Sequence, residues 1–236
     1  MKKIVLLFTV ICSAVLLQAQ QVNDPNAEIR TAKNFHGIDV SNAFDVYLTQ
    51  SNEEAVAVSA ATEKDRDLIK VEVKNGILYV GLDSKGWKLK SGNRKLKAYI
   101  SFKQIDKLSI SGACDVYLSG TLKADELSIN QSGASDLKEA RLDVNKLTID
   151  LSGASDMRVT GRAGQTSIEA SGASSFRGYD LSTENCHVKA SGASDVKITV
   201  NKELSAHATG ASDIRYKGDA SMRDLHSSGS SSVSRG

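Results

Sequence analysis

The stretch Ser152-Gly153-Ala154-Ser155-Asp156, S-G-A-S-D, decides the fold, because versions of it recur about every twenty residues through the second half of the sequence. The glycines at the centres of these units are Gly112, Gly133, Gly153, Gly172, Gly192, Gly210 and Gly229, spaced 21, 20, 19, 20, 18 and 19 residues apart. Self-similarity at this period is typical of a solenoid, in which each repeat buries its apolar face only against its neighbours.

Alignment of the repeats on their glycines shows alternation of apolar and polar residues. An apolar row stands four residues after the glycine: Val116, Leu137, Met157, Phe176, Val196 and Ile214. A second stands four residues before it: Leu108, Ile129, Ile149, Ile168, Val188 and Ala206. Period-two patterning indicates β-strands with one buried face, and no helical period is present. We therefore predict an all-β parallel β-helix of about 20 residues per coil, with three short sides and a glycine at one bend.

Two rows of charge run along the predicted outer wall. Aspartate stands three residues after the glycine at 115, 136, 156, 195 and 213, with Ser175 interrupting the row. Two residues further on are Lys138, Arg158, Arg177, Lys197 and Arg215, with Tyr117 in the first coil. We expect the two rows to neutralise each other as a surface zipper, since stacked carboxylates alone would repel. A cation-binding role for the aspartates is the alternative.

The first half of the chain is less regular. Val40 to Leu48 is a divergent copy of Ile110 to Leu118, with Asn42 in the place of the glycine. Strand-like runs follow, and Lys74-Asn75-Gly76 predicts a hairpin turn between two of them. We predict one domain over 31–236, made of N-terminal β-layers with a basic hairpin insertion (31–105) and regular coils (106–236), after a lead-in at 20–30.

The N-terminus predicts export. Lys2 and Lys3 precede an apolar stretch that ends near Ala19, so residues 1–19 are expected to be a cleaved signal peptide, leaving no transmembrane span. Removal of the two lysines changes the net charge from +2 to 0, which gives no general attraction for nucleic acid. Cys114 and Cys186 fall about four coils apart, too far to form a disulfide, so we predict two free, buried thiols.

Three features together resemble a known family. They are the opening I-D-V-S-N-A-F-D-V-Y-L (38–48), the central V-E-V-K-N-G-I-L-Y-V (71–80) and the serial S-G-A-S-D coils. The chain resembles the auto-transporter adhesin family with a head GIN domain, a domain of unknown function found in exported proteins. The resemblance covers nearly all of the expected mature chain and implies a right-handed β-helix.

One local segment suggests a ligand site. Six cationic residues lie within thirteen residues that contain no acidic residue: Lys85, Lys88, Lys90, Arg94, Lys95 and Lys97. Trp87, the only tryptophan of the chain, lies among them. An indole ring stacks on sugars and cations meet carboxylate or phosphate, so this segment could contact an acidic polysaccharide or a lipid head group. The alternative is a solvated hairpin whose tryptophan covers one end of the solenoid.

The sequence favours a non-enzymatic, adhesin-like binding module located in the periplasm or at the cell surface. Its partner would be polysaccharide or another envelope protein, with no cofactor. The alternatives are a periplasmic structural or protein-interaction element and, third, a carbohydrate-active β-helix enzyme. The regular outer wall argues against the enzyme, and no G-x-S-x-G nucleophile motif occurs. His187 and His207 lie one coil apart without an evident third ligand, which argues against zinc.

Overall fold

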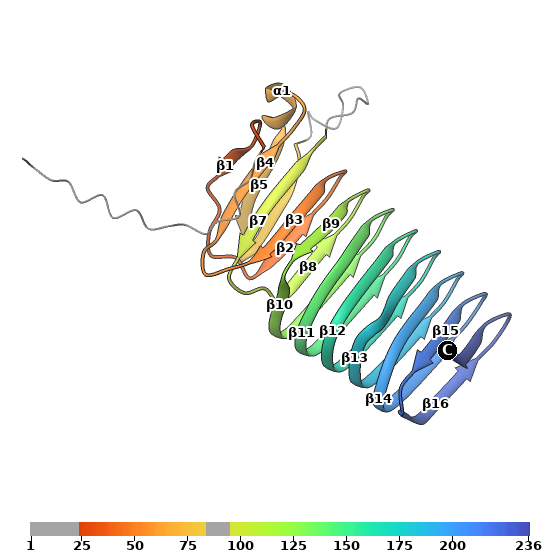
Figure 1. The fold of residues 1–236 in the computed structure, drawn as a ribbon. Coiled ribbons are helices and arrows are strands. Elements are labelled where there is room, and N and C mark those ends of the chain that lie inside the picture. Colours follow the sequence, from red (N-terminus) through yellow and green to blue (C-terminus); the bar gives the residue numbers. More distant parts are fainter. Residues whose placement is uncertain (1–23, 84–94) are drawn as a thin grey trace, which may run out of the picture.

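The computed structural model describes residues 24–83 and 95–236 and shows a β-solenoid (Figure 1). The predicted fold class is confirmed: 66% of the described residues are in strands and 2% in a helix, with about 6 turns about 20 residues apart and a less regular N-terminal part. The predicted signal peptide lies outside the described residues.

The regular coils stack as parallel strands. In chain order they are β8 (Lys107–Ile110), β9 (Asp115–Ser119), β10 (Thr121–Gln131), β11 (Asp136–Leu151), β12 (Asp156–Ala170), β13 (Ser175–Ala190), β14 (Asp195–Ala208), β15 (Asp213–Lys217), β16 (Ser221–Ser227) and β17 (Ser232–Arg235). Each pairs with its equivalent one coil away, so that Leu137 meets Met157 and Phe176 meets Val196. The apolar rows of the sequence are therefore columns in the core.

Each long strand turns two corners, which gives the coil its three sides. Along β11 the buried residues are Leu137, then Ala140, Leu142 and Val144, then Leu147, Ile149 and Leu151. Buried residues along β11 are two residues apart, except that the spacing is three between Leu137 and Ala140 and between Val144 and Leu147. The extra residue at each of these places lies at a corner, where the chain turns. The S-G-A-S segment makes the third corner.

Backbone atoms of adjacent coils meet closely at this third corner. Gly133 has φ +82, and a Cβ built on it would lie 2.3 Å from the carbonyl oxygen of Gly112. The next residue's amide donates to the same oxygen, with Ala134 N at 2.7 Å from Gly112 O, and the pattern repeats in each later coil. The alanines themselves are exposed on the outside of the bend, so close packing of their methyl groups does not explain why they are small.

The serine row two residues after the glycine has a bonding role as well as a small size. Ser155 is buried, and its hydroxyl donates to the carbonyl of Ser152 at 2.8 Å. The same bond forms at Ser135, Ser174, Ser194 and Ser212. Cys114 takes this place in the first regular coil and is free and buried, as is Cys186.

The described residues of the N-terminal part form seven strands and one short helix: β1 (Glu28–Arg30), β2 (Gly37–Val40), β3 (Asp45–Gln50), β4 (Ala55–Ser59), α1 (Glu63–Arg66), β5 (Ile69–Lys74), β6 (Ile77–Leu82) and β7 (Lys97–Phe102). The predicted hairpin is present, since β5 and β6 pair antiparallel around Asn75 (φ 50) and Gly76 (φ 75). Asn42 has φ 81, as its place in the glycine row requires, and its Oδ1 accepts from Leu82 N at 2.8 Å.

Strand order in this part differs from chain order. β3 lies between β7 and β9 and is parallel to both. β4 pairs antiparallel with β7, and β1 pairs antiparallel with β4. One wall of the solenoid therefore runs from β1 through β4, β7, β3 and β9 into the regular coils.

Candidate functional site

Two outward rows follow this wall from β7 to β15. The acid row contains Asp45, Asp115, Asp136, Asp156, Ser175, Asp195 and Asp213, which are paired in register from coil to coil. Two residues further along each strand is a second row, which we call the tyrosine–cation column: Tyr99, Tyr47, Tyr117, Lys138, Arg158, Arg177, Lys197 and Arg215. The column thus changes from aromatic to cationic at Tyr117.

The three tyrosines stack face to face. The ring centroids of Tyr99 and Tyr47 are 5.1 Å apart, and those of Tyr47 and Tyr117 are 5.2 Å apart, with interplanar angles of 14° and 13°. Burial, followed by the negative charge of Asp45, raises the pKa of Tyr47. One face of Tyr117 covers Tyr47, and Lys138 Nζ lies 5.5 Å from the centroid of the Tyr117 ring. Tyr117 is therefore the last ring of the stack, next to the cations.

The predicted zipper forms, but its ion pairs vary in closeness. Arg215 holds Asp195 and Asp213 at 2.9 Å each, and Lys197 holds Asp195 at 3.1 Å. Lys138 binds Asp115 at 3.1 Å. In contrast, Arg177 lies 3.8 Å from Asp156, and Lys138 lies 3.8 Å from Asp136. Arg158 pairs at 3.5 Å with Glu139, a residue of neither row, instead of with an aspartate.

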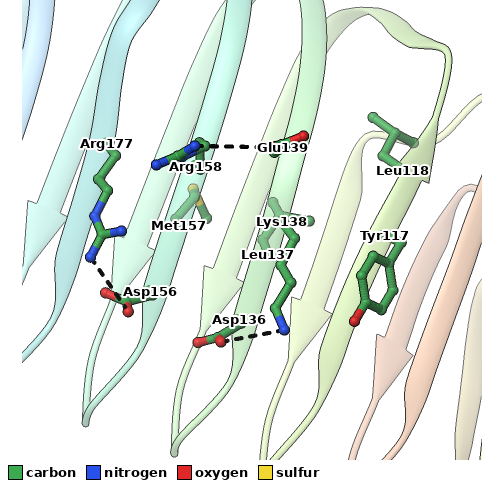
Figure 2. A pocket seen from close by; sticks show the side chains of 10 residues that line it. All are labelled: Tyr117, Leu118, Asp136, Leu137, Lys138, Glu139, Asp156, Met157, Arg158 and Arg177. Atoms are coloured by element: carbon green, nitrogen blue, oxygen red, sulfur yellow. Dashed lines mark ion pairs between the residues drawn. The ribbon is translucent and has the colours of Figure 1, made fainter.

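The looser pairs border a groove of about 510 Å³, which we call the tyrosine groove (Figure 2). Its polar lining is Tyr117, Asp136, Lys138, Glu139, Asp156, Arg158 and Arg177, and Leu118, Leu137 and Met157 add apolar surface. Three cations and three carboxylates thus line the groove, and the one aromatic side chain, Tyr117, lies at one end of it.

Irregularities of the ladder lie beside the groove. The register of β11 with β12 shifts between Leu137 and Ala140, and Glu139 has φ 51. The register of β12 with β13 shifts between Arg158 and Gly161. Bulges of this kind re-aim side chains and interrupt pairing, and they occur often beside functional sites. Here they directly follow Leu137 and Arg158, two residues that line the groove.

Most of the predicted basic segment cannot be placed. Lys85, Trp87, Lys88, Lys90 and Arg94 lie outside the described residues. Lys95 is exposed with φ 47, and Lys97 begins β7, where its Nζ lies 3.4 Å from Asp24. Lys97 is in register with Asp45 and two residues from Tyr99. The described end of the segment therefore enters the wall that carries the tyrosine–cation column.

A second hollow, of about 400 Å³, lies on another side of the regular coils and includes Gln165, Asn185, His187 and Ser205. Burial, Lys189 and His207 lower the pKa of His187. Within 24–83 and 95–236, no group of three or more histidine, cysteine, aspartate or glutamate side chains could hold a metal ion. In those same ranges, no helix has the length and apolar character needed to cross a membrane.

Sequence reasoning missed the tyrosine column and Glu139. A signal for two of the rings was present, because Asp45-Val46-Tyr47-Leu48 repeats Asp115-Val116-Tyr117-Leu118. The place of Tyr99 had no such signal, since it depends on β7 lying beside β3.

The fold defines the class of protein as a β-solenoid, and one wall of it carries a groove lined by aromatic and charged side chains. The family model described as "putative auto-transporter adhesin, head GIN domain" matches residues 34–220, and the chain belongs to this family. The predicted resemblance is confirmed. No curated protein matches the chain.

Solved structures share the fold. A "putative adhesin" from Bacteroides fragilis is 22% identical with a TM-score of 0.81, covering 89% of this chain and 95% of its own. A "putative lipid binding protein" from Parabacteroides distasonis is 20% identical with a TM-score of 0.66, covering 90% and 97%. A "putative adhesin" from Parabacteroides merdae is 18% identical with a TM-score of 0.61, covering 89% and 95%. At these identities the likeness shows the fold alone.

Proposed function

We propose that the chain is an exported, non-enzymatic, adhesin-like module that binds envelope or extracellular polysaccharide along the tyrosine–cation column. The observation that supports this most directly is the tyrosine groove, which is lined by the last ring of an aromatic stack and, further along, by arginines in loose ion pairs. Membership of the adhesin family is consistent with a binding role.

The Tyr117 ring supplies the apolar part of a sugar site. Tyr47 is stacked between two rings, whereas the Tyr117 ring stacks on Tyr47 and has the flexible ammonium group of Lys138 5.5 Å from its centroid. Movement of that side chain would expose the ring to a sugar. Aromatic side chains combine an apolar face with a polar tip, which suits a ligand that has both C–H and hydroxyl surfaces.

The charged groups supply the polar part. The Arg158–Glu139 and Arg177–Asp156 pairs are 3.5 and 3.8 Å apart, beyond good hydrogen-bonding distance, so donors and acceptors remain available to sugar hydroxyls. Arginine also accepts carboxylates in a bidentate manner, which suits an acidic sugar. Lys97, at the described end of the basic segment, adds a cation at the start of the same wall.

A periplasmic structural or protein-interaction role is the second candidate, and the open last coil favours it. A lipid site would need an apolar cavity for acyl chains, whereas the two hollows described above are surface grooves with many polar and charged residues in their lining. An enzyme would require Asp136 or Asp156 of the groove to act as acid or base.

The test is a glycan panel with neutral and acidic polysaccharides, followed by calorimetry on the best ligand. We expect Tyr117→Ala and the double variant Arg158→Ala/Arg177→Ala each to weaken binding at least about tenfold, a loss typical of removed stacking or charged contacts. Arg162→Ala is the matched control, because Arg162 is exposed and pairs with Asp143 on a different side of the coil.

Variants of the basic segment show whether the ligand binds at that segment or at the tyrosine groove. If Trp87→Ala/Lys88→Ala/Lys90→Ala abolishes binding and the groove variants do not, the ligand contacts that segment instead of the groove. A panel without any binding overturns the proposal. Release of sugar products that is lost in Asp156→Ala would establish the enzyme alternative.

A further inference from the structure

The last coil leaves one end of the solenoid open (Figure 1). β16 pairs with β14 and β17 pairs with β15, each on one side only. Among the residues that the structure describes, no strand pairs with the outer edges of β16 and β17. All seven residues of β16 are exposed. An open strand edge carries free backbone donors and acceptors that can pair with another strand.

The apolar core rows also continue to this end without a cover. Met222 is in register with Leu204, and Leu225 with Ala206. Leu204 and Ala206 are both 0% exposed, whereas Met222 and Leu225 are 38% and 44% exposed. Covering the last coil would therefore remove apolar surface from water as well as pairing the edge.

A bulge places both apolar side chains on the inner face. The register of β14 with β16 shifts between Leu204 and Ser205, so Arg223 is the residue without a partner in β14. Met222 and Leu225, three residues apart, both point inward for that reason, while Asp224 is aligned with the outward Ser205.

Two residue types that often protect an edge strand are absent from this coil. The segment 218–236 contains neither proline nor lysine, the residues that often block edge pairing. The opposite end of the solenoid is built differently, from the antiparallel β1 and β4, α1 and the β5–β6 hairpin. The surface that best matches the open end is therefore the same end of another copy.

We propose that two copies of the chain associate end to end by antiparallel pairing of β16 with β16 about a two-fold axis between Arg223 and Asp224. In this register Met222 faces Leu225 of the second copy, and Arg223 faces Asp224 of the second copy. The sequence Met-Arg-Asp-Leu is thus complementary to itself in apolar character and in charge.

The charges also select the register. Arg223 lies 3.0 Å from Glu203 and Asp224 lies 2.6 Å from His207, yet both side chains are more than half exposed and can meet a second copy. An axis through Asp224 would place two aspartates opposite each other, and like charges directly opposite are destabilising. The proposed axis avoids this contact.

The experiment measures the mass of the exported chain by light scattering over a wide concentration range, with small-angle X-ray scattering for shape. We expect a reversible monomer–dimer equilibrium, and a dimer about twice as long as the monomer because the solenoids are joined at their ends. Leu225→Lys should raise the dimer dissociation constant at least about tenfold, with unchanged circular dichroism, since the side chain is already exposed.

Charge reversal tests the register. Arg223→Asp alone should weaken the dimer, and addition of Asp224→Arg should restore it, because the pair is then present in the opposite sense. Thr148→Lys, on an exposed wall position, should leave the dimer unchanged. A monomer at all concentrations, oligomers larger than a dimer, a dimer that tolerates Leu225→Lys, or failure of the double reversal would each overturn the proposal. Glycan binding by Leu225→Lys reports on the polysaccharide site separately.

Discussion

At the S-G-A-S bends of the solenoid, one carbonyl oxygen of the preceding coil leaves room for glycine but not for a residue with a Cβ. Gly153 has φ +74, and a Cβ there would lie 2.4 Å from the carbonyl oxygen of Gly133. That oxygen accepts the amide of Ala154 at 2.8 Å, so it cannot move without breaking the link between coils. The requirement for glycine therefore has two parts, a left-handed backbone and a backbone neighbour at the place of the side chain.

The two parts can be separated by comparing two glycines. Gly120 has φ +79 but no atom within 4 Å of its would-be Cβ. Gly120→Ala should therefore lower the free energy of unfolding by about 1–2 kcal/mol, the cost of a left-handed alanine. Gly153→Ala should lower it by about 3–4 kcal/mol, since the clash adds to that cost. Urea denaturation at 25 °C measures both, and equal losses would show that the carbonyl contact is unimportant.

Among the elements, β7 has the largest influence on the candidate site, because it brings Tyr99 against Tyr47. Its position is held from the N-terminal side by Asp24, whose Oδ2 accepts from Tyr99 Oη at 2.9 Å. Asp24 also accepts from the amide of Asn26 at 3.0 Å and lies 3.4 Å from Lys97 Nζ. The loop before β1 thus holds Tyr99 and Lys97 in place at the start of the tyrosine–cation column, and we call these contacts of Asp24 the clip.

The clip predicts a dependence of stability on pH. Burial by itself raises the pKa of Asp24, but hydrogen bonds from Asn26, Tyr99 and Ser59 and the charge of Lys97 outweigh it, so the net pKa is lowered. A lowered folded-state pKa stabilises the fold above the unfolded pKa of about 3.9, and this contribution is lost as the pH falls through the folded value. Asp24→Asn should therefore cost about 1–2 kcal/mol at pH 7.

Urea titrations at pH 7 and at pH 2.5 check this expectation. The difference between the wild-type chain and Asp24→Asn should shrink at the lower pH, because the wild-type carboxylate is then becoming protonated. Asp180→Asn is the control, since Asp180 is exposed and its replacement should change stability by less than about 0.5 kcal/mol. A difference that is constant with pH would mean that the charge of Asp24 does not hold the clip.

At the scale of the whole molecule, stability is distributed along one dimension. Each regular coil pairs only with the coil before and the coil after it, as β12 does with β11 and β13. In such arrays, stability is close to a sum over repeats and their interfaces. Loss of an end coil should therefore be tolerated better than a break in the middle.

A chain that stops at Lys217, without β16 and β17, tests this view. We expect it to fold with strand content reduced only by the missing coil, because β14 and β15 lose one neighbour each and earlier coils lose none. Its urea m-value should fall in proportion to the surface that is no longer buried. Circular dichroism and urea denaturation provide the measurement, and a globally unfolded product would show that the last coil is needed for the array to form.

The sequence by itself determined the features that depend on neighbouring residues. The twenty-residue period, the alternation along each side, the glycine bends and the Asn75-Gly76 hairpin all follow from local backbone preferences and from which face of a strand is apolar. The charged zipper was also predictable, because equivalent positions of stacked coils must align. Arg158 is an exception, because it pairs with Glu139 instead of with an aspartate of the acid row. Glu139 has φ 51 and lies at a bulge, which the repeat pattern of the sequence does not predict.

Only the tertiary structure decided the candidate site. Tyr99, Tyr47 and Tyr117 stack in an order that is not their order in the chain, because β3 lies between β7 and β9. The tyrosine groove adjoins Glu139, where the register of β11 with β12 shifts, and this register is a property of two strands from different coils. Local patterns fix the face on which a side chain lies, whereas strand order and register depend on contacts between distant residues.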